Sequence, residues 1–324
     1  MKMTEEQELL RKRFLEPETR CETYISAERK AAWKVLLDIL EMVIGICERH
    51  GLSYYICAGS LLGAARHGGI IPWDDDVDVE MPRRDYDKFL SLVQAELPKG
   101  YFAQTSATDE EFIITHLKIR KDGTAGVDYK HGKKLKCFHM GIFLDVFPLD
   151  GVPASVADED RIESELAHLR EIRASAFRRR HKHAILGWLK SLANRLRFRL
   201  MGGRRLFERR EALLRAHDMS ATEECVLAPS EFHFRSRFRR SSSFYREGFV
   251  ELPFEYLTVR APVRYEELLT VTYGDWHKFV KGSAMHPELI LDATHDYRDV
   301  LRDRYGYDDR LLAKCQLGER VALR

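Results

Sequence analysis

The sequence lacks the long apolar runs and the cysteine patterns that mark several classes of protein. No apolar run approaches the roughly 18 residues of a membrane-spanning helix. The first ten residues are charged and contain no apolar signal-peptide segment, so we expect a cytoplasmic protein. The six cysteines are scattered without metal-ligand spacing. This scatter argues against a zinc site and a disulfide framework, and it predicts reduced, mostly buried thiols.

The composition and the apolar patterning predict a mixed fold of helices and strands. The 324 residues suffice for one large domain or for a core with an insertion, and 44% of them are hydrophobic. Ser26 can cap a helix that runs to His50, and Pro82 suits the start of another. Strands are expected at residues 101–104, 112–120 and 124–129. The predicted class is α/β (α+β), with a mixed sheet flanked by helices.

A turn of small residues precedes a short helical segment. Ala58, Gly59 and Ser60 form the turn, and the helical segment runs from Leu61 to Arg66. Backbone N–H groups of such a turn can approach an anion at the N-terminus of the next helix. Gly59, Ser60 and Arg66 are therefore candidate residues for binding a phosphate group.

Two aspartates follow the turn on a valine-bearing segment. We expect this segment to be a strand, so that Asp76 and Asp78 project from the same side of it. Two carboxylates held that closely repel each other unless a cation lies between them, and Mg²⁺ or Mn²⁺ prefers oxygen ligands. By itself this spacing is a weak signal, because acidic turns at strand ends are common.

A third aspartate, Asp145, lies inside the apolar run of residues 141–149. A charge in such a run is costly unless it is paired or bound to metal. The alternative interpretation is that Asp145 caps a helix or pairs with an arginine. Together with the turn, Asp76, Asp78 and Asp145 form the pattern of a nucleotidyltransferase superfold. The three are predicted to bind metal and to be catalytic.

Two cations lie between the predicted strands, and alternation puts Lys118 and Arg120 on one face. They are candidates for a phosphate clamp. The alternative is an exposed, charged edge strand.

Residues 59–79 (GSLLGAARHGGIIPWDDDVDV) and 139–153 (HMGIFLDVFPLDGVP) resemble the LicD family of phosphotransferases. Its best-known members attach phosphocholine to cell-surface glycans, and the animal fukutin-related ribitol-phosphate transferases are relatives. The resemblance runs from about residue 28 to 153 and resumes at 249–286, which includes Tyr273-Gly274-Asp275-Trp276. It implies a CDP-activated alcohol as donor, most often CDP-choline, and CMP as leaving group. It also implies a glycan or glycolipid acceptor.

The sequence departs from the family pattern at two places. Ala58 stands where the family more often has glycine, and His286 remains where the family often has two histidines. The sequence assigns no role to His67, His139 or His286. Trp73, Trp276 and the Phe-rich segment 232–238 are candidates for contact with a quaternary ammonium group.

Two other functions stay open. One is nucleotidyl transfer from a nucleoside triphosphate with release of pyrophosphate, because the same metal site could serve it. The other is a non-catalytic scaffold of the same fold. The presence of all three carboxylates favours an enzyme.

Residues 170–215 contain fifteen Lys or Arg and three Glu, a net charge of +12, whereas the whole chain carries +2. Their apolar side contains Ala184, Ile185, Leu186, Trp188, Leu189, Leu192 and Leu196. A basic amphipathic helix of this kind indicates contact with an anionic membrane or partner, and hence a peripheral location on the inner face of the membrane. The alternative is a helical insertion whose cations are solvated. Nucleic acid is not expected, because no binding module or set of interleaved aromatic residues accompanies the charge.

Four segments are expected along the chain. Residues 1–25 form a polar lead-in with little structure, and residues 26–153 form the catalytic core. Residues 154–248 form the basic helical insertion and a loop near the substrate entrance. Residues 249–324 complete the domain.

Overall fold

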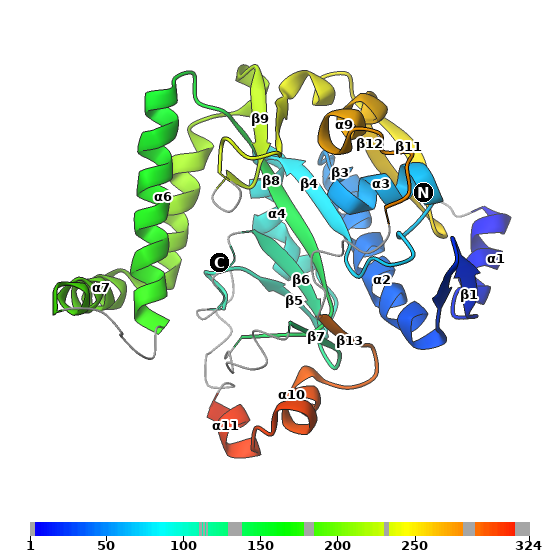
Figure 1. Cartoon of the computed structure of the whole chain (residues 1–324), viewed down its shortest axis with the longest axis horizontal. Coiled ribbons are helices and arrows are strands. Elements are labelled where there is room, and N and C mark those ends of the chain that lie inside the picture. The colour runs from blue at the N-terminus through cyan, green and yellow to red at the C-terminus, as the bar shows by residue number, and fades with distance from the viewer. Residues whose placement is uncertain are drawn as a thin grey trace.

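The computed structural model describes residues 4–109, 112, 114, 116–128, 138–177, 185–229, 233–280 and 289–314 (Figure 1). The described α-helices are α1 (Glu5–Arg13), α2 (Ala27–His50), α3 (Ala58–His67), α4 (Arg83–Glu96), α6 (Val156–Phe177), α7 (Ile185–Arg215), α9 (Tyr265–Tyr273), α10 (Tyr297–Tyr305) and α11 (Asp309–Lys314). The strands are β1 (Glu18–Arg20), β2 (Thr23–Ile25), β3 (Tyr55–Ile56), β4 (Asp78–Pro82), β5 (Tyr101–Gln104), β6 (Leu117–Lys121), β7 (Ala125–Asp128), β8 (Phe143–Gly151), β9 (Glu224–Leu227), β10 (Arg239–Ser241), β11 (Phe249–Phe254), β12 (Leu257–Pro262) and β13 (Leu289–Asp292).

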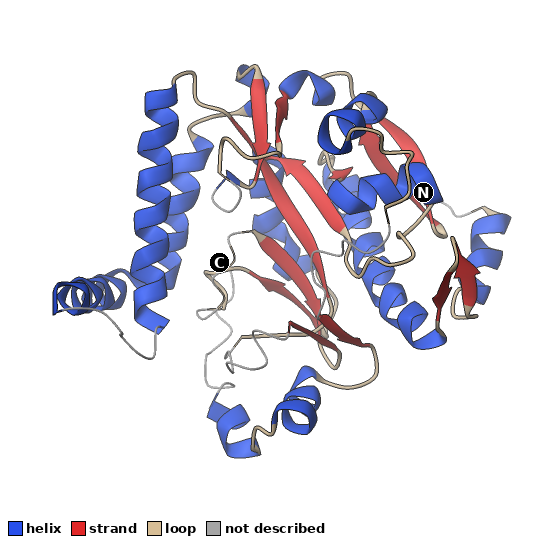
Figure 2. Ribbon diagram, viewed as in Figure 1, coloured by secondary structure: helices blue, strands red, loops and turns tan. Residues whose placement is uncertain are grey.

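A seven-stranded mixed sheet is centred on β8 (Figure 2). On one side β4 pairs with β8 in parallel, and β3 then pairs with β4. On the other side β6 pairs with the first part of β8 and β9 with its last part, both antiparallel. The outer strands β5 and β10 pair with β6 and β9. All nine residues of β8 are buried, which accounts for its mostly apolar sequence around Asp145 and Asp150. The predicted fold class is confirmed.

Two helices pack on one face of the sheet, because α2 and α4 touch each other and both touch β8. Helix α2 begins where its cap predicts, since the Ser26 hydroxyl accepts a hydrogen bond from the Arg29 N–H. It ends at Gly51, whose φ of +61° suits a residue without a Cβ. The two helices predicted in this part of the chain are confirmed.

The N-terminal segment differs from the prediction. Residues 4–25 are not a polar lead-in with little structure, because they form α1 and the β1–β2 hairpin. The Thr4 side chain and the Gln7 side chain form a capping box at the start of α1. Phe14 is buried in the main core, and Arg20 pairs with Glu255 in the β11–β12 turn at 2.7 Å. The expectation failed because several contacts that order this segment come from distant parts of the chain: Arg20 pairs with Glu255, and Phe14 packs on the Tyr256 ring.

The basic insertion consists of α6 and α7. Helix α7 is broken at Gly202, where φ is +74° and ψ is 164°, as the Gly202-Gly203 pair predicts. Beyond the break, Leu206 packs with Leu169 of α6, and Leu214 packs with residues of α6 and β9. Before the break, α7 extends away from α6 at the left edge of the molecule in Figure 1.

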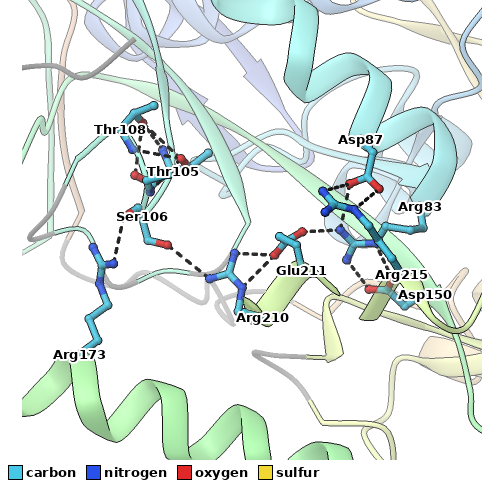
Figure 3. A network of polar contacts seen from close by, with 11 residues as sticks. Arg83, Asp87, Thr105, Ser106, Thr108, Asp150, Arg173, Arg210, Glu211 and Arg215 are labelled. Atoms are coloured by element: carbon cyan, nitrogen blue, oxygen red, sulfur yellow. Dashed lines mark hydrogen bonds and ion pairs between the residues drawn. The ribbon is translucent and has the colours of Figure 1, made fainter. Parts of the chain in front are cut away.

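A buried ion-pair network joins the insertion to the sheet (Figure 3). Arg83 of α4 donates to both carboxylate oxygens of Asp150 in β8, the longer contact being 2.7 Å, and it also donates to Glu211 of α7. Arg210 pairs with Glu211, and Arg215 pairs with Asp87 of α4 at 2.6 Å. The last two turns of α7 are therefore fixed to the core by paired charges.

The last described part of the chain adds one hairpin, the strand β13 and three short helices. The β11–β12 hairpin lies against β3 and α3. Strand β13 pairs with β7 outside the main sheet. Helix α10 begins after Asp296, whose side chain accepts a hydrogen bond from the Arg298 N–H, and ends at Gly306, where φ is +69°. Among the residues that the structure describes, no helix is both long and apolar enough to cross a membrane.

Candidate active site

The site is built on three neighbouring strands. The register places Asp78 of β4 opposite Asp145 of β8, and Lys118 of β6 on the other side of Asp145. The Lys118 Nζ lies 2.5 Å and 2.7 Å from the two carboxylate oxygens of Asp145, and His116 Nε2 lies 3.0 Å from one of them. Although burial opposes its charge, Lys118 and His116 hold the pKa of Asp145 well below its usual range. Asp145 therefore pairs with a lysine and a histidine rather than with the arginine considered above.

The acidic loop lies just before β4. That strand begins at Asp78, so Asp76 is in the preceding loop and not on the same strand as predicted. Asp76, Asp78 and Asp145 nevertheless line one cavity. The sequence did not single out Asp74 and Asp75, yet one carboxylate oxygen each from Asp74, Asp75 and Asp76 lie within 4.8 Å of one another.

Crowding of carboxylates changes their acidity. Burial, together with the charges of Asp76 and Asp75, raises the pKa of Asp74 to about 8. Burial and the charges of Asp76 and Asp145 raise the pKa of Asp78 well above its ordinary value. A divalent cation would relieve this repulsion, and an all-carboxylate donor set suits Mg²⁺ or Mn²⁺. The residues present therefore fit such an ion.

Ala58, Gly59 and Ser60 form the first turn of α3 and not a separate turn before a helix that begins at Leu61, and they hold the acidic loop in place. Ala58 has a φ of +49°, the left-handed conformation that glycine adopts more easily. Gly59 lines the cavity, and a Cβ there would lie 2.8 Å from Asp74 Oδ2. Ser60 is buried, and its hydroxyl accepts a hydrogen bond from the Asp78 N–H at 2.9 Å. Ser60 therefore positions Asp78, whereas its predicted contact with a nucleotide stays a prediction.

The cavity has a volume of about 500 Å³ and combines acidic, cationic and aromatic walls. Its cationic side chains come from α3, β6 and the two segments after residue 230: Arg66, Lys118, Arg237 and Lys278. Its aromatic side chains are Trp73, Phe147, Phe238, Tyr273 and Trp276. The loop expected near the substrate entrance thus contributes Arg237 and Phe238 to the cavity, whereas Phe234 is buried elsewhere and Phe232 lies outside the described residues.

Arg66 links α3 to the C-terminal part of the chain. It lines the cavity, and its Nη1 donates to the backbone oxygens of Trp276 and Lys278 at 3.0 Å and 3.2 Å. Its guanidinium also lies over the Phe279 ring. Partial burial lowers the pKa of Arg66. The residue thus both borders the cavity and holds one wall of it.

Arg120 does not lie at the cavity, where it was predicted to form a phosphate clamp with Lys118. It is buried, does not line the cavity, and donates to the Gln104 side chain and to the Gly141 backbone oxygen. Burial lowers its pKa to about 10. The alternative of an exposed edge strand is also wrong, because β6 lies between β5 and β8. Alternation correctly placed Lys118 and Arg120 on one strand face, but only Lys118 reaches the cavity.

Among His67, His116 and His139, His116 lines the cavity, and His67 and His139 make contacts outside it. His116 lines the cavity and was missed, although it lies two residues before Lys118 and alternation could have found it. His67 packs against the rings of Trp73 and Phe279, and burial lowers its pKa to about 4. His139 contacts Asp122 and accepts from the Gly141 N–H. His286 lies outside the described residues.

Comparison with known proteins finds relatives over this same part of the chain. Residues 51–153 match the LicD/FKTN/FKRP nucleotidyltransferase domain. The lipopolysaccharide cholinephosphotransferase LicD of Haemophilus influenzae is 37% identical over 123 residues, which are 37% of this chain and 43% of that protein. The human ribitol 5-phosphate transferase FKRP is 44% identical over 63 residues, 19% of this chain and 13% of that protein. The matches thus span less than half of each of these relatives. The part of the chain that matches this family model, residues 51–153, contains Gly59 and Ser60, the acidic loop and Asp145.

Proposed function

We propose that this chain is a metal-dependent phosphotransferase that moves a substituted phosphate from a nucleotide-activated donor to a hydroxyl of a glycan or glycolipid. One observation carries the proposal: the register of three strands gathers Asp78, Asp145 and Lys118 beneath a cavity with cationic and aromatic walls. The names of the relatives, a cholinephosphotransferase and a ribitol 5-phosphate transferase, support the same reaction class.

The metal would be Mg²⁺ or Mn²⁺, held by Asp76, Asp78 and Asp145, with Asp74 close enough to contribute. When bound, such an ion would neutralise phosphate oxygens and the charge that develops on the leaving group. Lys118 supplies a fixed positive charge to Asp145 in the absence of any ligand. Its predicted role on a donor phosphate stays a prediction.

The proposed donor is a CDP-linked alcohol, with CDP-choline as the first candidate. Its phosphates would lie over Gly59 at the N-terminus of α3, where the capping residue Cys57 makes no side-chain hydrogen bond to the first turn. Arg66 and Arg237 line the same cavity and would balance the phosphate charge. Trp73 and Trp276 offer the ring faces that a quaternary ammonium group favours.

In the proposed step the acceptor hydroxyl oxygen forms a bond to the distal phosphorus of the donor. The bond from that phosphorus to the bridging oxygen breaks, and CMP leaves with the bridging oxygen and its electron pair. The hydroxyl proton needs an acceptor, and Asp145 is the predicted base. Its partners Lys118 and His116 favour its charged form, which makes this carboxylate a weak proton acceptor.

The acceptor class also bears on where the protein acts. A glycolipid or an envelope glycan precursor is reached from a membrane surface. We therefore propose a cytoplasmic protein that is peripheral on the inner face of the membrane.

The test is an incubation of the purified protein with Mg²⁺, a cell-envelope extract and one CDP-linked donor at a time: CDP-choline, CDP-ribitol or CDP-glycerol. The proposal expects CMP from at least one donor and none with Asp78→Asn. Pyrophosphate from a nucleoside triphosphate, with no CMP from any donor, would indicate a nucleotidyltransferase instead. Donor binding without either product would indicate a scaffold.

A further inference from the structure

The first part of α7, residues 187–201, turns a side of mixed polarity toward the protein, on which Phe198 and Met201 pack against the cluster of Leu169, Ile172 and Leu206. Ser191 and Asn194 are buried, and Asn194 Nδ2 lies 3.5 Å from the Ser175 hydroxyl of α6. Arg195 Nε donates to the Ser175 backbone oxygen at 3.0 Å. These polar contacts with α6 fix the rotation of the helix about its axis.

The opposite side of this part of α7 is apolar and exposed. Its members are Trp188 (49% exposed), Leu189 (52%), Leu192 (49%), Leu196 (58%) and Leu200 (71%). Positions 188, 192, 196 and 200 recur every four residues, so their side chains line one side of the helix. We call these five residues the α7 apolar face. This part of α7 thus exposes its leucines, whereas a surface helix of a soluble domain usually turns its main apolar stripe inward.

The same helix has the usual orientation beyond its break. Leu206, Phe207 and Leu214 are buried against the rest of the protein. The non-helical backbone at Gly202 separates the two parts. The outward leucines therefore belong to one part of α7 and are not a feature of the whole insertion.

Cations flank the α7 apolar face on both sides. At about 100° per residue, Lys190 and Arg197 lie beyond one edge of the face, and Arg199 lies near its other edge. All three side chains are exposed. This part of α7 thus combines leucines and a tryptophan facing outward with a rim of positive charge.

We propose that the α7 apolar face docks on an anionic lipid surface, with its leucines and Trp188 in the headgroup boundary and Lys190, Arg197 and Arg199 against lipid phosphates. Tryptophan and leucine bordered by Lys and Arg are the residues of helices that lie in the membrane interface. Each cation near such a surface adds electrostatic attraction. The contact does not depend on the chemistry of the cavity.

Two other occupants fit the charges less well. A second copy of the chain would bring two positive rims together, and like charges facing each other oppose association. A nucleic acid would meet the cations but would leave five large apolar side chains without an apolar partner. An anionic bilayer offers an apolar region to the leucines and Trp188, and it offers negative charge to the flanking cations.

The experiment is flotation of the purified full chain with vesicles of phosphatidylcholine alone or of phosphatidylcholine mixed with phosphatidylglycerol. We expect binding to the anionic vesicles that weakens as salt rises. Leu192→Ser with Leu196→Ser should lower that binding at least about tenfold, since binding scales with buried apolar area. Reversing Lys190, Arg197 and Arg199 to Glu should lower it at least as much.

The chain offers a matched control for each variant. Leu9 and Leu10 of α1 are exposed to a similar extent and lie at the opposite edge of the molecule, so Leu9→Ser with Leu10→Ser should bind like wild type (Figure 1). Arg84, Lys99 and Arg304 are exposed cations outside the insertion, and reversing them to Glu controls for net charge.

Four results would overturn the proposal. The first two are equal binding to both vesicle types and no binding to either. The third is undiminished vesicle binding by the Leu192 and Leu196 variant. The fourth is that the wild-type protein does not bind vesicles but self-associates or binds RNA, and that this variant abolishes that association. CMP release with a water-soluble acceptor should be normal in this variant. The lipid contact and the proposed chemistry can therefore fail separately.

Discussion

Two clusters of charge are built in opposite ways in this molecule. The cavity cluster crowds carboxylates together: Asp74, Asp75 and Asp76 lie close to one another, and Asp78 lies beside Asp145, which pairs with Lys118 and His116. The network at the insertion holds three cations and three anions: Arg83, Arg210, Arg215, Asp87, Asp150 and Glu211. Matched charges join helices to the sheet in the network. In the cavity, burial and the charges of neighbouring carboxylates raise the pKa of Asp74 and Asp78. We propose that a divalent cation relieves this crowding.

The largest effect is expected from breaking the balanced network. Arg83→Met leaves Asp150 and Glu211 buried without their main cation. Removing one partner of a buried ion pair typically costs about 3–5 kcal/mol in the free energy of unfolding. Urea unfolding followed by circular dichroism measures this loss. As a control, Arg13→Ala breaks an exposed pair with Glu16 and should leave the urea midpoint unchanged. An equal loss of stability in both variants would show that the buried network stabilises the fold no more than an exposed ion pair does.

The next prediction concerns Asp78 in the cavity, whose replacement should lower turnover without lowering stability. Asp78→Asn removes one of several repelling carboxylates, so the protein should be at least as stable as wild type. Turnover should fall at least about a hundredfold, because a major electrostatic contribution to catalysis is lost. CMP release and the thermal midpoint are measured on the same preparation. Near-normal turnover would exclude Asp78 from the site.

Asp145 should behave differently, although it lies beside Asp78. Asp145→Asn removes the charge partner of buried Lys118, so both turnover and the thermal midpoint should fall. The double variant Asp145→Asn with Lys118→Met should recover part of the stability and none of the activity. A double variant no more stable than Asp145→Asn alone would show that the pair does not matter for the fold.

A smaller effect is expected from adding metal. An ion that binds only the folded protein stabilises it by about 2.7 kcal/mol at a hundred times its dissociation constant. Mg²⁺ or Mn²⁺ should therefore raise the thermal midpoint of wild type and have little effect on Asp78→Asn. The Arg83→Met variant, which leaves the cavity intact, should respond like wild type. An equal shift in all three proteins would indicate nonspecific binding.

The smallest effect concerns pH in the absence of metal. The pKa of Asp74 is raised to about 8, above the ordinary value of 3.8 expected in the unfolded chain. Between these values the folded protein holds a proton that the unfolded chain has released, so this carboxyl makes stability fall as pH rises. Asp74→Asn should lessen that fall between about pH 4 and pH 8. Identical pH profiles of the two proteins would contradict the crowding of carboxylates at Asp74.

Local sequence signals predicted much of the fold around the site. Ser26 and Gly51 mark the ends of α2 because capping and left-handed backbone are properties of single residues. Strand β5 has its predicted bounds, and Asp145 lies within a buried strand, as its apolar flanks indicate. The acidic residues that the sequence singled out, Asp76 and Asp78, do line the cavity with Asp145.

Pairing between distant strands decided what local signals could not. Alternation treats Lys118 and Arg120 alike, but the register sets Lys118 against Asp145 and Arg120 against Phe143. From the sequence, Trp276 was only a candidate for contact with a quaternary ammonium group and Tyr273 had no assigned role, because only folding brings the last part of the chain to the cavity. Strand alternation also places His116 on the same face as Lys118, but the sequence prediction did not include it.

The sequence by itself determined which chemical groups this protein carries: small residues at the start of α3, closely spaced aspartates, an aspartate in an apolar strand and a basic amphipathic segment. The tertiary structure decided which of these groups meet and which way they face. Periodicity shows which residues share a side of a helix or strand, but it does not show which side meets the core. That choice rests on contacts between distant residues. It turned the leucines of α7 outward and ordered the N-terminal segment against the β11–β12 hairpin.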